Sequence, residues 1–494
     1  MTLSELCARS GIAESGNGQS PEIKHLTLDS RLVQPGSLFV CMPSNRQDSH
    51  AFLPTAAAAG AVATIVHKES AVAEARALGL EAIYLPAESY ADTLWQLARA
   101  FYNSPTASYK LIGVTGTNGK TTTAFIMRQM LTALGRRAGY LGTLGFTLPE
   151  SSIELNNTTP FALELYARLD EARTANLDAL CMEVSSHALA EKRADGLEFD
   201  AAIFTNLTQD HLDFHGTLEQ YADAKFRLFS ELPLQSDKSF KAAINVADPV
   251  GRAFAKRITQ PVLTFSTEPN MEADYQFTAI DVQLDSITFD LKTPTGNHRL
   301  TAGLGGLFNV ENLASAVTGL IAAGYPLEDL LKTTQNLKPV PGRFENVPIE
   351  ASFRVIVDYA HTPDALEKLL DSVRPLTAGR VITVVGCGGD RDKTKRPLMG
   401  FAASQRSDLT IVTSDNPRTE DPETIVAEVL DGIAPNRPAI AIVDRAEAIA
   451  HAVGFASEND VVVIAGKGHE NYQIIGHEKF PFDDRDFVRE ALKK

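Results

Sequence analysis

A glycine-rich turn followed by Lys-Thr is the strongest chemical signal in the chain. The residues Gly116-Thr-Asn-Gly-Lys-Thr121 follow the apolar run Lys110–Val114 and precede a helical pattern over Thr123–Leu134. Glycines in such a turn let backbone N–H groups approach an anion, and the helix N-terminus adds positive potential. The spacing predicts a phosphate-binding loop in which Lys120 reaches the outer phosphates and Thr121 helps to hold Mg²⁺. The strict P-loop pattern is not met, because valine occupies the position of its first glycine.

Carboxylates and imidazoles follow two further apolar runs. Glu183 ends one run, and the segment Asp210-His-Leu-Asp-Phe-His215 comes shortly after the run Ala201–Thr205. The carboxyl ends of parallel strands meet at one edge of a sheet, where such sheets bind ligands. Beside a phosphate loop, a carboxylate and an imidazole are candidates for holding Mg²⁺ or for ordering its ligands, and the second segment offers Asp210, His211, Asp213 and His215. The alternative interpretation of the second segment is a polar loop with a hydrogen-bonded histidine.

Three more polar loops follow apolar runs in the last third of the chain. They cover residues 385–393, 414–418 and 465–470, and on one parallel sheet they would converge at its carboxyl edge. Guanidinium groups pair with carboxylates and acidic groups pair with ammonium, so this set suits a zwitterion. The alternative for residues 466–470 is a second phosphate loop. The polar side chains are Arg391, Asp415, Asn416, Arg418 and Glu470.

The elements that must position these residues alternate between short β-branched runs and helical segments. This alternation predicts an α/β fold with mainly parallel sheets. Two uncharged stretches, Ala51–Val66 and Asn312–Leu327, are interpreted as Ala-rich buried helices, and Tyr275–Leu300 as a β excursion within the middle domain. The clearest strands are Lys110–Val114, Ala179–Val184, Ala201–Thr205, Val355–Asp358, Val381–Val385, Leu409–Thr413 and Val461–Ala465.

The length of 494 residues predicts about three domains. Segments with linker composition lie at residues 103–108 and 338–342. The predicted domains are therefore residues 1–108, 109–340 and 341–494.

Charge and cysteine content exclude several classes of protein. Lys and Arg total 46 and Asp and Glu total 62, giving a net charge of −16, which argues against non-specific nucleic-acid binding. The four cysteines form no CxxC pair, so we expect no zinc or redox motif and a reducing, cytoplasmic setting. We also expect no signal peptide. We expect no membrane span, because the longest uncharged stretches, Ala51–Val66 and Asn312–Leu327, fall short of the ~20 apolar residues that a span needs.

The run Thr115–Thr123 resembles the ATP-binding motif of the Mur ligase family, the ATP-dependent amide-forming ligases of peptidoglycan synthesis. Folylpolyglutamate synthetases share this motif. The resemblance extends from about Leu26 to Arg485. It implies a three-domain α/β architecture with a variant P-loop central domain and a Rossmann-like C-terminal domain. The three domains would bind a UDP-sugar peptide, ATP and an amino acid, in that order.

The resemblance also assigns residues to ATP and metal. It implies catalytic roles for Lys120, Glu183, His211 and Lys225, with Lys225 carrying a carbamate that helps to hold the metal. From the sequence alone, Lys225 would be a solvated helix lysine. The implied metal ligands are Thr121, Glu183, His211 and Lys225. The implied ATP contacts are Thr115, Gly116, Thr117, Asn118, Gly119, Lys120, Thr121, Thr122, Asn312, Arg343, Asp358 and His361.

The remaining assignments concern the two other substrates. Residues 415–418 resemble the D-N-P-R motif of family members that add meso-diaminopimelate, whereas lysine-adding relatives lack the arginine. The implied diaminopimelate contacts are Arg391, Asp415, Asn416, Pro417, Arg418, Gly466 and Glu470. The implied UDP-sugar contacts are Leu28, Ser30, Asn45, Arg46, Gln47, Asn157, Thr158, Thr159, Ser185, Glu191 and Arg193.

The resemblance therefore implies a monomeric ligase that joins meso-diaminopimelate to UDP-N-acetylmuramoyl-L-alanyl-D-glutamate through an acyl phosphate. Its cofactors would be ATP, Mg²⁺ and the Lys225 carbamate, with small-molecule partners only. A folylpolyglutamate-synthetase-like ligase is disfavoured by the uridine-type N-terminal segment and by residues 415–418. A P-loop switch or motor is disfavoured by the loops suited to a zwitterion.

Overall fold

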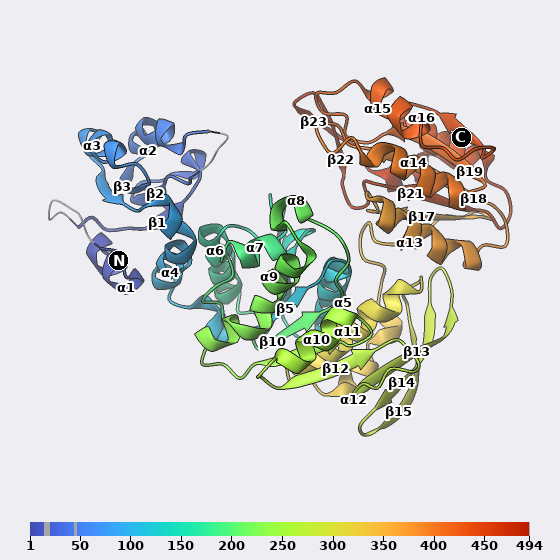
Figure 1. The fold of residues 1–494 in the computed structure, drawn as a ribbon, viewed down its shortest axis with the longest axis horizontal. Helices are drawn as coiled ribbons and strands as arrows, with labels where there is room; N and C mark the ends of the chain where they lie inside the picture. Colours follow the sequence, from blue (N-terminus) through green and yellow to red (C-terminus); the bar gives the residue numbers. More distant parts are fainter. Residues whose placement is uncertain (14–19, 44–46, 494) are drawn as a thin grey trace. The chain divides into compact units, whose positions relative to one another are not determined.

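The computed structural model describes residues 1–13, 20–43 and 47–493. The chain divides into two compact units, each described by itself below (Figure 1). The first contains Met1–Ser266, Met271–Tyr275 and Ser315–Leu330, and the second contains Thr267–Asn270, Gln276–Ala314 and Leu331–Lys494.

The first unit begins with a parallel four-stranded sheet of order β1-β2-β3-β4. Its elements are α1 (Leu3–Ser10), β1 (His25–Thr27), η1 (Ser30–Leu32), β2 (Ser37–Val40), η2 (Ser49–Phe52), α2 (Leu53–Ala58), β3 (Ala61–Val66), α3 (Glu69–Ala77), β4 (Glu81–Tyr84), η3 (Ala87–Ser89) and α4 (Tyr90–Tyr102).

The prediction of one buried helix over Ala51–Val66 is wrong. Helix α2 ends at Ala58, and β3 begins at Ala61 after Gly60, whose φ of +98° places the turn in the left-handed region. The β-branched residues after this glycine favour a strand, and they fill the centre of the N-terminal sheet. The second Ala-rich stretch is mostly helical, as predicted, since α11 covers Phe308–Ala322.

The larger sheet of the first unit has the order β12-β11-β10-β5-β9-β6-β7-β8, parallel from β12 to β6. Helix α5 packs along β5, β6 and β9. The elements are η4 (Pro105–Ser108), β5 (Lys110–Thr115), α5 (Lys120–Ala133), β6 (Ala138–Gly142), β7 (Gly145–Thr147), β8 (Ser152–Ile153), α6 (Ala162–Thr174), β9 (Ala179–Glu183), α7 (Ser186–Ala190), β10 (Ala201–Phe204), α8 (Leu212–His215), α9 (Leu218–Ser230), η5 (Leu232–Gln235), β11 (Lys241–Asn245), α10 (Pro249–Arg257) and β12 (Val262–Ser266).

An antiparallel β meander follows, which agrees with the β structure predicted for this stretch. Its strands are β13 (Tyr275–Val282), β14 (Ile287–Thr293) and β15 (Gly296–Ala302). Most of it groups with the second unit rather than with the phosphate loop. Helices α11 (Phe308–Ala322) and α12 (Leu327–Leu331) and the turn η6 (Thr334–Asn336) lead to the C-terminal segment.

The C-terminal sheet has six strands in the order β16-β17-β21-β18-β19-β20, all parallel except β16. Alternate strand residues face two separate apolar layers, one with α13–α15 and one with α16 and α17. The elements are β16 (Glu345–Asn346), β17 (Arg354–Asp358), α13 (Pro363–Val373), η7 (Arg374–Leu376), β18 (Val381–Cys387), α14 (Lys395–Arg406), β19 (Leu409–Ser414), α15 (Pro422–Leu430), β20 (Ala439–Ala441), α16 (Arg445–Phe455), β21 (Val461–Ala465), β22 (Tyr472–Ile475), β23 (Glu478–Pro481) and α17 (Asp484–Ala491).

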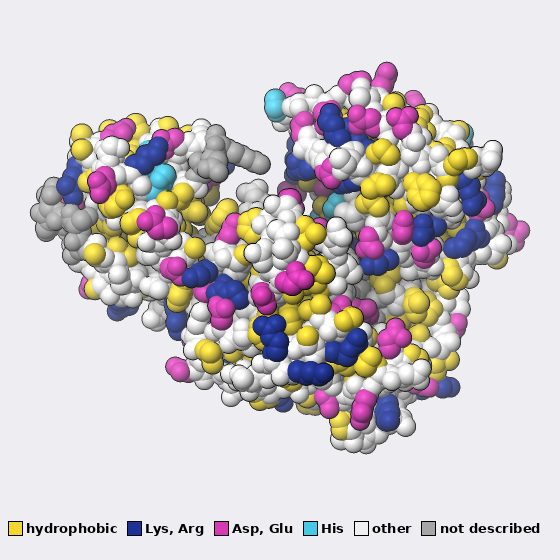
Figure 2. All heavy atoms as spheres, in the orientation of Figure 1, with side chains coloured by type: hydrophobic (Ala, Val, Ile, Leu, Met, Phe, Trp, Pro, Cys, Tyr) yellow, Lys and Arg dark blue, Asp and Glu magenta, His cyan; other side chains and the backbone are white. Residues whose placement is uncertain are grey.

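The predicted α/β class with mainly parallel sheets is confirmed, and all seven predicted strands are present within a residue or two of their expected ends. In the described part of the chain, no helix is long and apolar enough to cross a membrane. Basic and acidic side chains are interspersed on the face drawn in Figure 2. The four cysteines are free and buried.

Candidate active site

The predicted phosphate loop joins β5 to the N-terminus of α5. Gly116 has a φ of +152°, and a Cβ atom there would lie 1.9 Å from Thr205 Oγ1. Gly119 caps α5 with a φ of +85°. Lys120 Nζ donates to the carbonyl oxygens of Gly116 and Thr117, both at 2.9 Å. The loop therefore needs its glycines, and its lysine lies over the turn, where phosphates bind in such loops.

The segment after β10 is hydrogen-bonded along this loop. The Asn206 carbonyl accepts from Thr117 N at 2.8 Å, and Asn206 Oδ1 accepts from Asn118 N at 3.0 Å. Thr205 Oγ1 donates to the carbonyl of Asn118 at 2.6 Å. These bonds place the start of the polar segment that leads to Asp210 and His211 against the phosphate loop.

Glu183 lies at the end of β9 and is fully buried. Its carboxylate accepts from Thr121 Oγ1 at 3.0 Å, from Thr143 N at 2.9 Å and from Thr143 Oγ1 at 3.2 Å. Tyr140 OH also donates to it. The structure thus joins two predicted metal ligands, Thr121 and Glu183, and adds Tyr140 and Thr143, which the sequence analysis did not single out.

Lys225 is the clearest correction to the reading from sequence alone, because it is buried rather than solvated. Its side chain on α9 is 1% exposed, and Nζ donates to the Gly116 carbonyl at 2.9 Å. The Tyr221 ring lies 4.3 Å from Nζ. Burial, and then the charge of Lys120, hold the pKa of Lys225 well below its usual value. An amine held in this way is more readily neutral, and a neutral amine is a nucleophile.

Three histidines cluster beside these lysines. His187 lies 4.7 Å from His211 and 5.4 Å from His215, measured between ring centroids. Burial lowers the pKa of all three, that of His215 to about 4. For His211, the charge of Asp210 partly offsets the effect of burial, while Lys120 and Lys225 lower the pKa further. At neutral pH the rings are therefore uncharged, which is the form of imidazole that binds metal ions.

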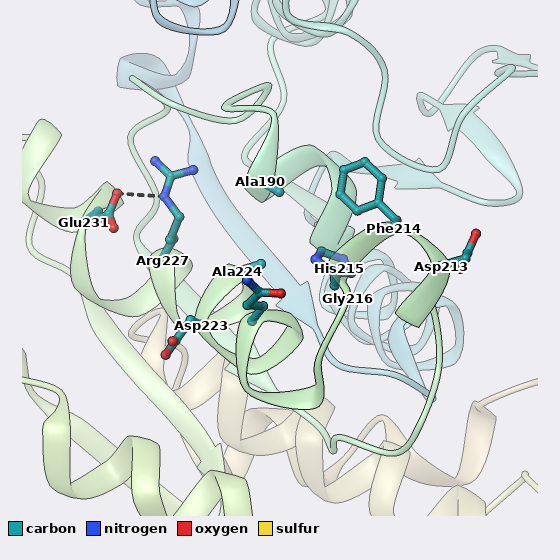
Figure 3. Close-up of a pocket in the computed structure, with 10 residues that line it drawn as sticks. Ala190, Asp213, Phe214, His215, Gly216, Asp223, Ala224, Arg227 and Glu231 are labelled. Carbon is teal, nitrogen blue, oxygen red and sulfur yellow. Dashed lines mark hydrogen bonds and ion pairs between the residues drawn. The ribbon is translucent and has the colours of Figure 1, made fainter.

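An open cavity of about 670 Å³ borders this histidine cluster. Figure 3 shows Phe214 and His215 of α8 on one side of it and Arg227 of α9 on another. Arg227 Nε donates to Glu231 at 2.7 Å, and another nitrogen of Arg227 donates to Asp195 at 2.9 Å. The cation of this cavity is thus already paired with two carboxylates.

Part of the predicted UDP-sugar set adjoins Glu183. Thr159 Oγ1 donates to the Glu183 carbonyl at 2.9 Å and accepts from Ser185 N at 3.1 Å. Arg193 donates to the Thr159 carbonyl at 3.0 Å and to Glu191 at 2.5 and 2.7 Å. In addition, the hydroxyls of Thr158 and Thr143 lie 3.1 Å apart, and Asn157 is half-buried just before them.

The described N-terminal members of that set lie in segments that connect strands of the first sheet. Leu28 and Ser30 follow β1, both half-buried, and Gln47 is exposed. Asn45 and Arg46 lie outside the described residues.

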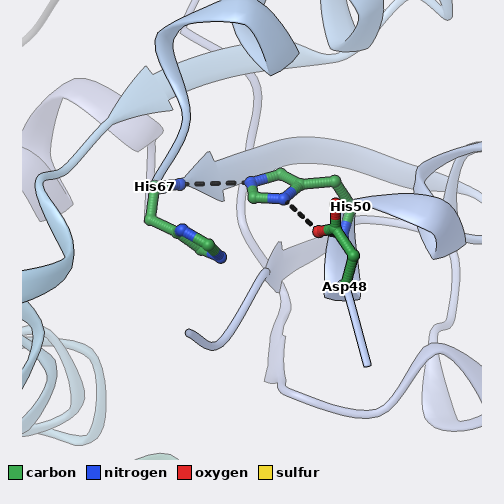
Figure 4. Close-up of side chains that lie close together, drawn as sticks. All are labelled: Asp48, His50 and His67. Atoms are coloured by element: carbon green, nitrogen blue, oxygen red, sulfur yellow. Dashed lines mark hydrogen bonds and ion pairs between the residues drawn. The ribbon is translucent and has the colours of Figure 1, made fainter. Parts of the chain in front are cut away.

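A small polar cluster fastens the chain next to Gln47 (Figure 4). Asp48 accepts from Lys68 at 2.6 Å and lies 2.6 Å from His50 Nδ1. His50 Nε2 accepts from the backbone of His67 at 3.3 Å. Ligand atoms of Asp48, His50 and His67 lie within 4.8 Å of one another. Asp48 and His50 are engaged in these hydrogen bonds, which link η2 to the end of β3.

In the second unit, the three predicted loops converge at the carboxyl ends of β18, β19 and β21. Asn416 Nδ2 donates to Glu470 at 2.8 Å, and Arg418 donates to the Gly389 carbonyl at 2.8 Å. A Cβ on Gly466 would lie 2.7 Å from Asp415 Oδ2. Pro417 is buried between these partners, whereas Arg391 is exposed.

Two supports of these loops were missed by the sequence analysis. Lys467 is fully buried, and its ammonium donates to Glu470 at 3.1 Å and to Asn416 Oδ1 at 3.3 Å. Gln473 on β22 donates to the Asp415 carbonyl at 2.7 Å. The aromatic and β-branched residues of Tyr472–Ile475 were the available signal for this strand.

Four of the implied ATP contacts lie in this unit. Asp358 is buried and accepts from Phe344 N and Ala360 N, both at 2.7 Å. Arg343 lies 4.6 Å from the ring of Tyr359, and His361 Nδ1 lies 2.8 Å from the Tyr359 carbonyl. Asn312 is buried on α11, where its amide donates to Asn309 at 2.9 Å.

The chain matches three models of one family in succession. They are described as the Mur ligase family catalytic domain (residues 22–102), the Mur ligase middle domain (residues 114–320) and the Mur ligase glutamate ligase domain (residues 342–468).

Curated relatives and solved structures agree with this match. The UDP-N-acetylmuramoyl-L-alanyl-D-glutamate--2,6-diaminopimelate ligase of Geobacillus thermodenitrificans is 42% identical over 97% of this chain and 96% of its own length. The ligase of the same name from Gloeobacter violaceus is 45% identical over 100% and 98%. A solved structure of a ligase of that name shares 35% identity, with a TM-score of 0.69 over 100% of this chain and 99% of its own.

A more distant structure shares the fold. The MurF ligase of Thermotoga maritima, solved in complex with ADP, has a TM-score of 0.64 at 20% identity over 95% of this chain and 97% of its own. The expected three-domain α/β architecture is thus confirmed, and the chain belongs to the Mur ligase family.

Proposed function

We propose that this protein is an ATP-dependent ligase that joins meso-diaminopimelate to UDP-N-acetylmuramoyl-L-alanyl-D-glutamate. The observation that carries the proposal is the full-length similarity to ligases of that name, at 42% and 45% identity. The convergence of the loop 415–418 with Glu470 supports the amino-acid half of the reaction. The phosphate loop supports the ATP half.

The chemistry begins with the carboxylate of the UDP-linked peptide, which is a poor electrophile. Transfer of the γ-phosphoryl group of ATP to a carboxylate oxygen would form an acyl phosphate and ADP. The amine of diaminopimelate then attacks the acyl carbon, and the tetrahedral intermediate releases phosphate. Lys120 would offset the repulsion between the ATP phosphates and the attacking carboxylate. The backbone N–H groups at the start of α5 would act in the same direction.

Mg²⁺ fits the donors around Glu183. Hard cations prefer oxygen ligands, and Thr121 Oγ1 lies 3.0 Å from a carboxylate oxygen of Glu183. His211, neutral at pH 7, would contribute nitrogen or orient a bound water. The ion, when bound, would neutralise charge on the phosphates, while Tyr140 and Thr143 orient the Glu183 carboxylate.

The proposal includes a carbamate on Lys225. Reaction of the neutral amine with CO₂ would form the N–C bond and release one proton, leaving a carbamate whose negative charge lies on its two oxygens. Burial favours the neutral amine, and Lys120 is an adjacent cation that such an anion would pair with.

The three substrates would be divided among three domains with boundaries near residues 108 and 340. Leu28, Ser30, Asn45, Arg46 and Gln47 would bind the uridine end. Asn157, Thr158, Thr159, Ser185 and Arg193 would bind the peptide end. Asn312, Arg343, Asp358 and His361 would contact ATP.

The free, buried cysteines fit a reducing, cytoplasmic compartment, and we propose a monomer.

In the second unit, Asp415 and Glu470 would hold the ammonium of the amino acid, and Arg418 and Arg391 its distal carboxylate.

The test is a panel of amino acids offered with ATP and the UDP-linked dipeptide, read by phosphate release and product mass. We expect release that needs both the dipeptide and meso-diaminopimelate, with a product heavier by one diaminopimelate residue. Equal use of lysine would overturn the specificity. Release without any amino acid would favour a switch or motor. Use of a folate acceptor would favour a folylpolyglutamate-synthetase-like ligase.

A further inference from the structure

A fully buried ion pair lies beneath the amino-acid loops. Arg445 begins α16 and Asp484 begins α17, and their side chains are both 0% exposed. The guanidinium donates to both carboxylate oxygens of Asp484 at 2.8 Å. The surrounding layer is apolar and includes Ala448 and Val488. Buried ion pairs are expensive to desolvate and are often no more stabilising than apolar residues of similar size, so stability alone does not explain this one.

The same guanidinium reaches two strand ends. It donates to the carbonyl of Ala465, the last residue of β21, at 3.2 Å, and to that of Ser414, the last residue of β19, at 3.4 Å. The next residues in the chain are Gly466 and Asp415, where two of the converging loops begin. The Arg445 side chain thus hydrogen-bonds to the residue that directly precedes each of these two loops.

The place of Arg445 also runs against local preference. A cation at the first position of a helix is disfavoured by the helix dipole, and acidic residues are preferred there. Burial lowers the pKa of Arg445, but Asp484, followed by Asp415 and Glu470, raises it above its usual value. Arg445 is therefore a permanent cation close to two acidic side chains of the loops. Residues that break a local rule are expected at functional positions.

We propose that Arg445 and Asp484 form a positioning pair that sets the spacing between the loops 415–418 and 466–470. Through this spacing, the pair controls affinity for the amino acid without touching it. This inference rests on the proposed function, because it assigns those loops to diaminopimelate.

The chain offers a matched control at the opposite edge of the same sheet. Arg380 precedes β18 and donates to Asp460, which precedes β21, at 2.7 Å. Both are arginine–carboxylate pairs, but Arg380 and Asp460 lie at the amino ends of the neighbouring strands β18 and β21, away from the loops. Arg445 instead reaches the carboxyl ends of β19 and β21, which lie on either side of β18.

The main experiment replaces both partners, as Arg445→Met with Asp484→Leu, so that no unpaired charge remains buried. We expect a folded protein whose KM for diaminopimelate rises about tenfold or more, since small displacements of binding groups have effects of this size. The KM values for ATP and the UDP-linked dipeptide should stay unchanged. Arg380→Met should lower the melting temperature without changing the KM for diaminopimelate. Arg445→Lys keeps the charge but not the forked donors, and should raise the same KM to a smaller extent.

An unchanged KM for diaminopimelate in the folded double variant would overturn the proposal. So would an equal rise in all three KM values, or the same rise in Arg380→Met, because each would indicate a general loss of structure. If the double variant does not fold, Arg445→Lys decides by the same criteria.

Failure of the proposed function would look different, since the wild-type protein would then show no diaminopimelate-dependent phosphate release. In that case amide hydrogen exchange decides the inference. We expect faster exchange within 415–418 and 466–470 in the Arg445 variants than in Arg380→Met, and equal rates would overturn it.

Discussion

The phosphate-loop region and the amino-acid loops both lie at the carboxyl ends of parallel strands, but they are built differently. Around the phosphate loop, the predicted functional groups contact one another directly. Thr121 bonds to Glu183, and Lys225 bonds to the Gly116 carbonyl. Around the amino-acid loops, much of the support comes from side chains that were not singled out from the sequence, including Lys467, Gln473 and Arg445.

The two regions also differ in charge. The charge of Lys120 lies close enough to disfavour the protonated form of Lys225, and Lys120 itself suits a region that receives phosphates and carboxylates. In the second unit, buried cations are paired with carboxylates, as Lys467 is with Glu470 and Arg445 with Asp484. A locally balanced site suits a zwitterion. The comparison shows that the first site is arranged to attract negatively charged groups. The second site instead balances positive and negative charges within itself.

The largest expected effect is at Lys120, and it tests whether the phosphate-loop region works by attracting anions. Lys120→Ala removes the cation over the turn, and we expect kcat for ligation to fall by at least about 100-fold. Steady-state phosphate release measures it. Lys192→Ala is the control, because Lys192 is a lysine of the same unit paired with Asp92 at the surface. Near-normal turnover of Lys120→Ala would show that the phosphate loop is wrongly assigned.

The next largest effect is expected at Lys225, where substitution should change activity and stability in opposite directions. Lys225→Met should lose most ligation, and in Lys225→Ala short-chain carboxylates should restore part of it if a carbamate on Nζ is required. Activity of the wild-type protein should fall in bicarbonate-free buffer and return when bicarbonate is added. An unaffected Lys225→Ala protein would contradict the carbamate.

The Lys225→Met variant should gain thermal stability although it loses activity. In CO₂-free buffer the folded-state pKa of Lys225 lies below the usual 10.5, so the unfolded chain binds more protons between the two values. Wild-type stability therefore contains a contribution that rises with pH through this window. Lys225→Met removes the titrating group and should melt higher at pH 7, by a margin that shrinks toward pH 10. A margin independent of pH would contradict the buried neutral amine.

The motifs predicted much of the fold and of both sites because they are local. Glycine turns, β-branched runs and loops after strands are read from neighbouring residues, and these gave the phosphate loop and the three converging loops. The error at Ala51–Val66 arose because alanine favours helix while the residues after Gly60 favour a strand in the sheet.

Burial of charged residues was the harder part. On α9 the buried residues Tyr221, Ala224, Lys225, Leu228 and Phe229 follow helical spacing, so Lys225 belongs to the apolar stripe. Arg445 does the same on α16, with Ala448, Ile449, Ala452 and Val453. A charge inside such a stripe was the available signal in both regions. Its partners could not be predicted, because they lie far away in the sequence.

Arg418 tests the charge-matching side of the comparison. Its backbone has a φ of +53°, uncommon for a residue with a side chain, and its guanidinium donates to Gly389. Arg418→Ala should raise the KM for diaminopimelate about tenfold to a hundredfold, since a charge-assisted contact contributes roughly 1.5–3 kcal/mol. The KM for ATP should not change. The measurement is kcat/KM for diaminopimelate and lysine, and unchanged discrimination would remove this assignment.

The smallest effect is expected at Glu191, which pairs with Arg193. This pair tests the comparison, because a cation paired with a carboxylate here occurs in the first unit rather than in the second. Glu191 accepts from Arg193 at 2.5 and 2.7 Å, while Arg193 also donates to the Thr159 carbonyl at 3.0 Å. If Arg193 binds the peptide carboxylate, the carboxylate of Glu191 competes with the substrate for the same cation. Glu191→Gln keeps the shape and removes the charge, so the KM for the UDP-linked dipeptide should fall.

The change should be only about two- to threefold, because Glu191 is partly exposed and such pairs contribute ~0–1 kcal/mol. The KM for diaminopimelate should stay the same. Initial rates over a range of dipeptide concentrations measure both, with Glu231→Gln as the control, since Glu231 accepts from Arg227 on α9. A higher KM for the dipeptide in Glu191→Gln would mean that Glu191 orients Arg193 for the substrate rather than competing with it. Substrate binding in the first unit would then also depend on a cation paired with a carboxylate. The phosphate-loop region and the amino-acid loops would in that case differ less in their charge arrangement.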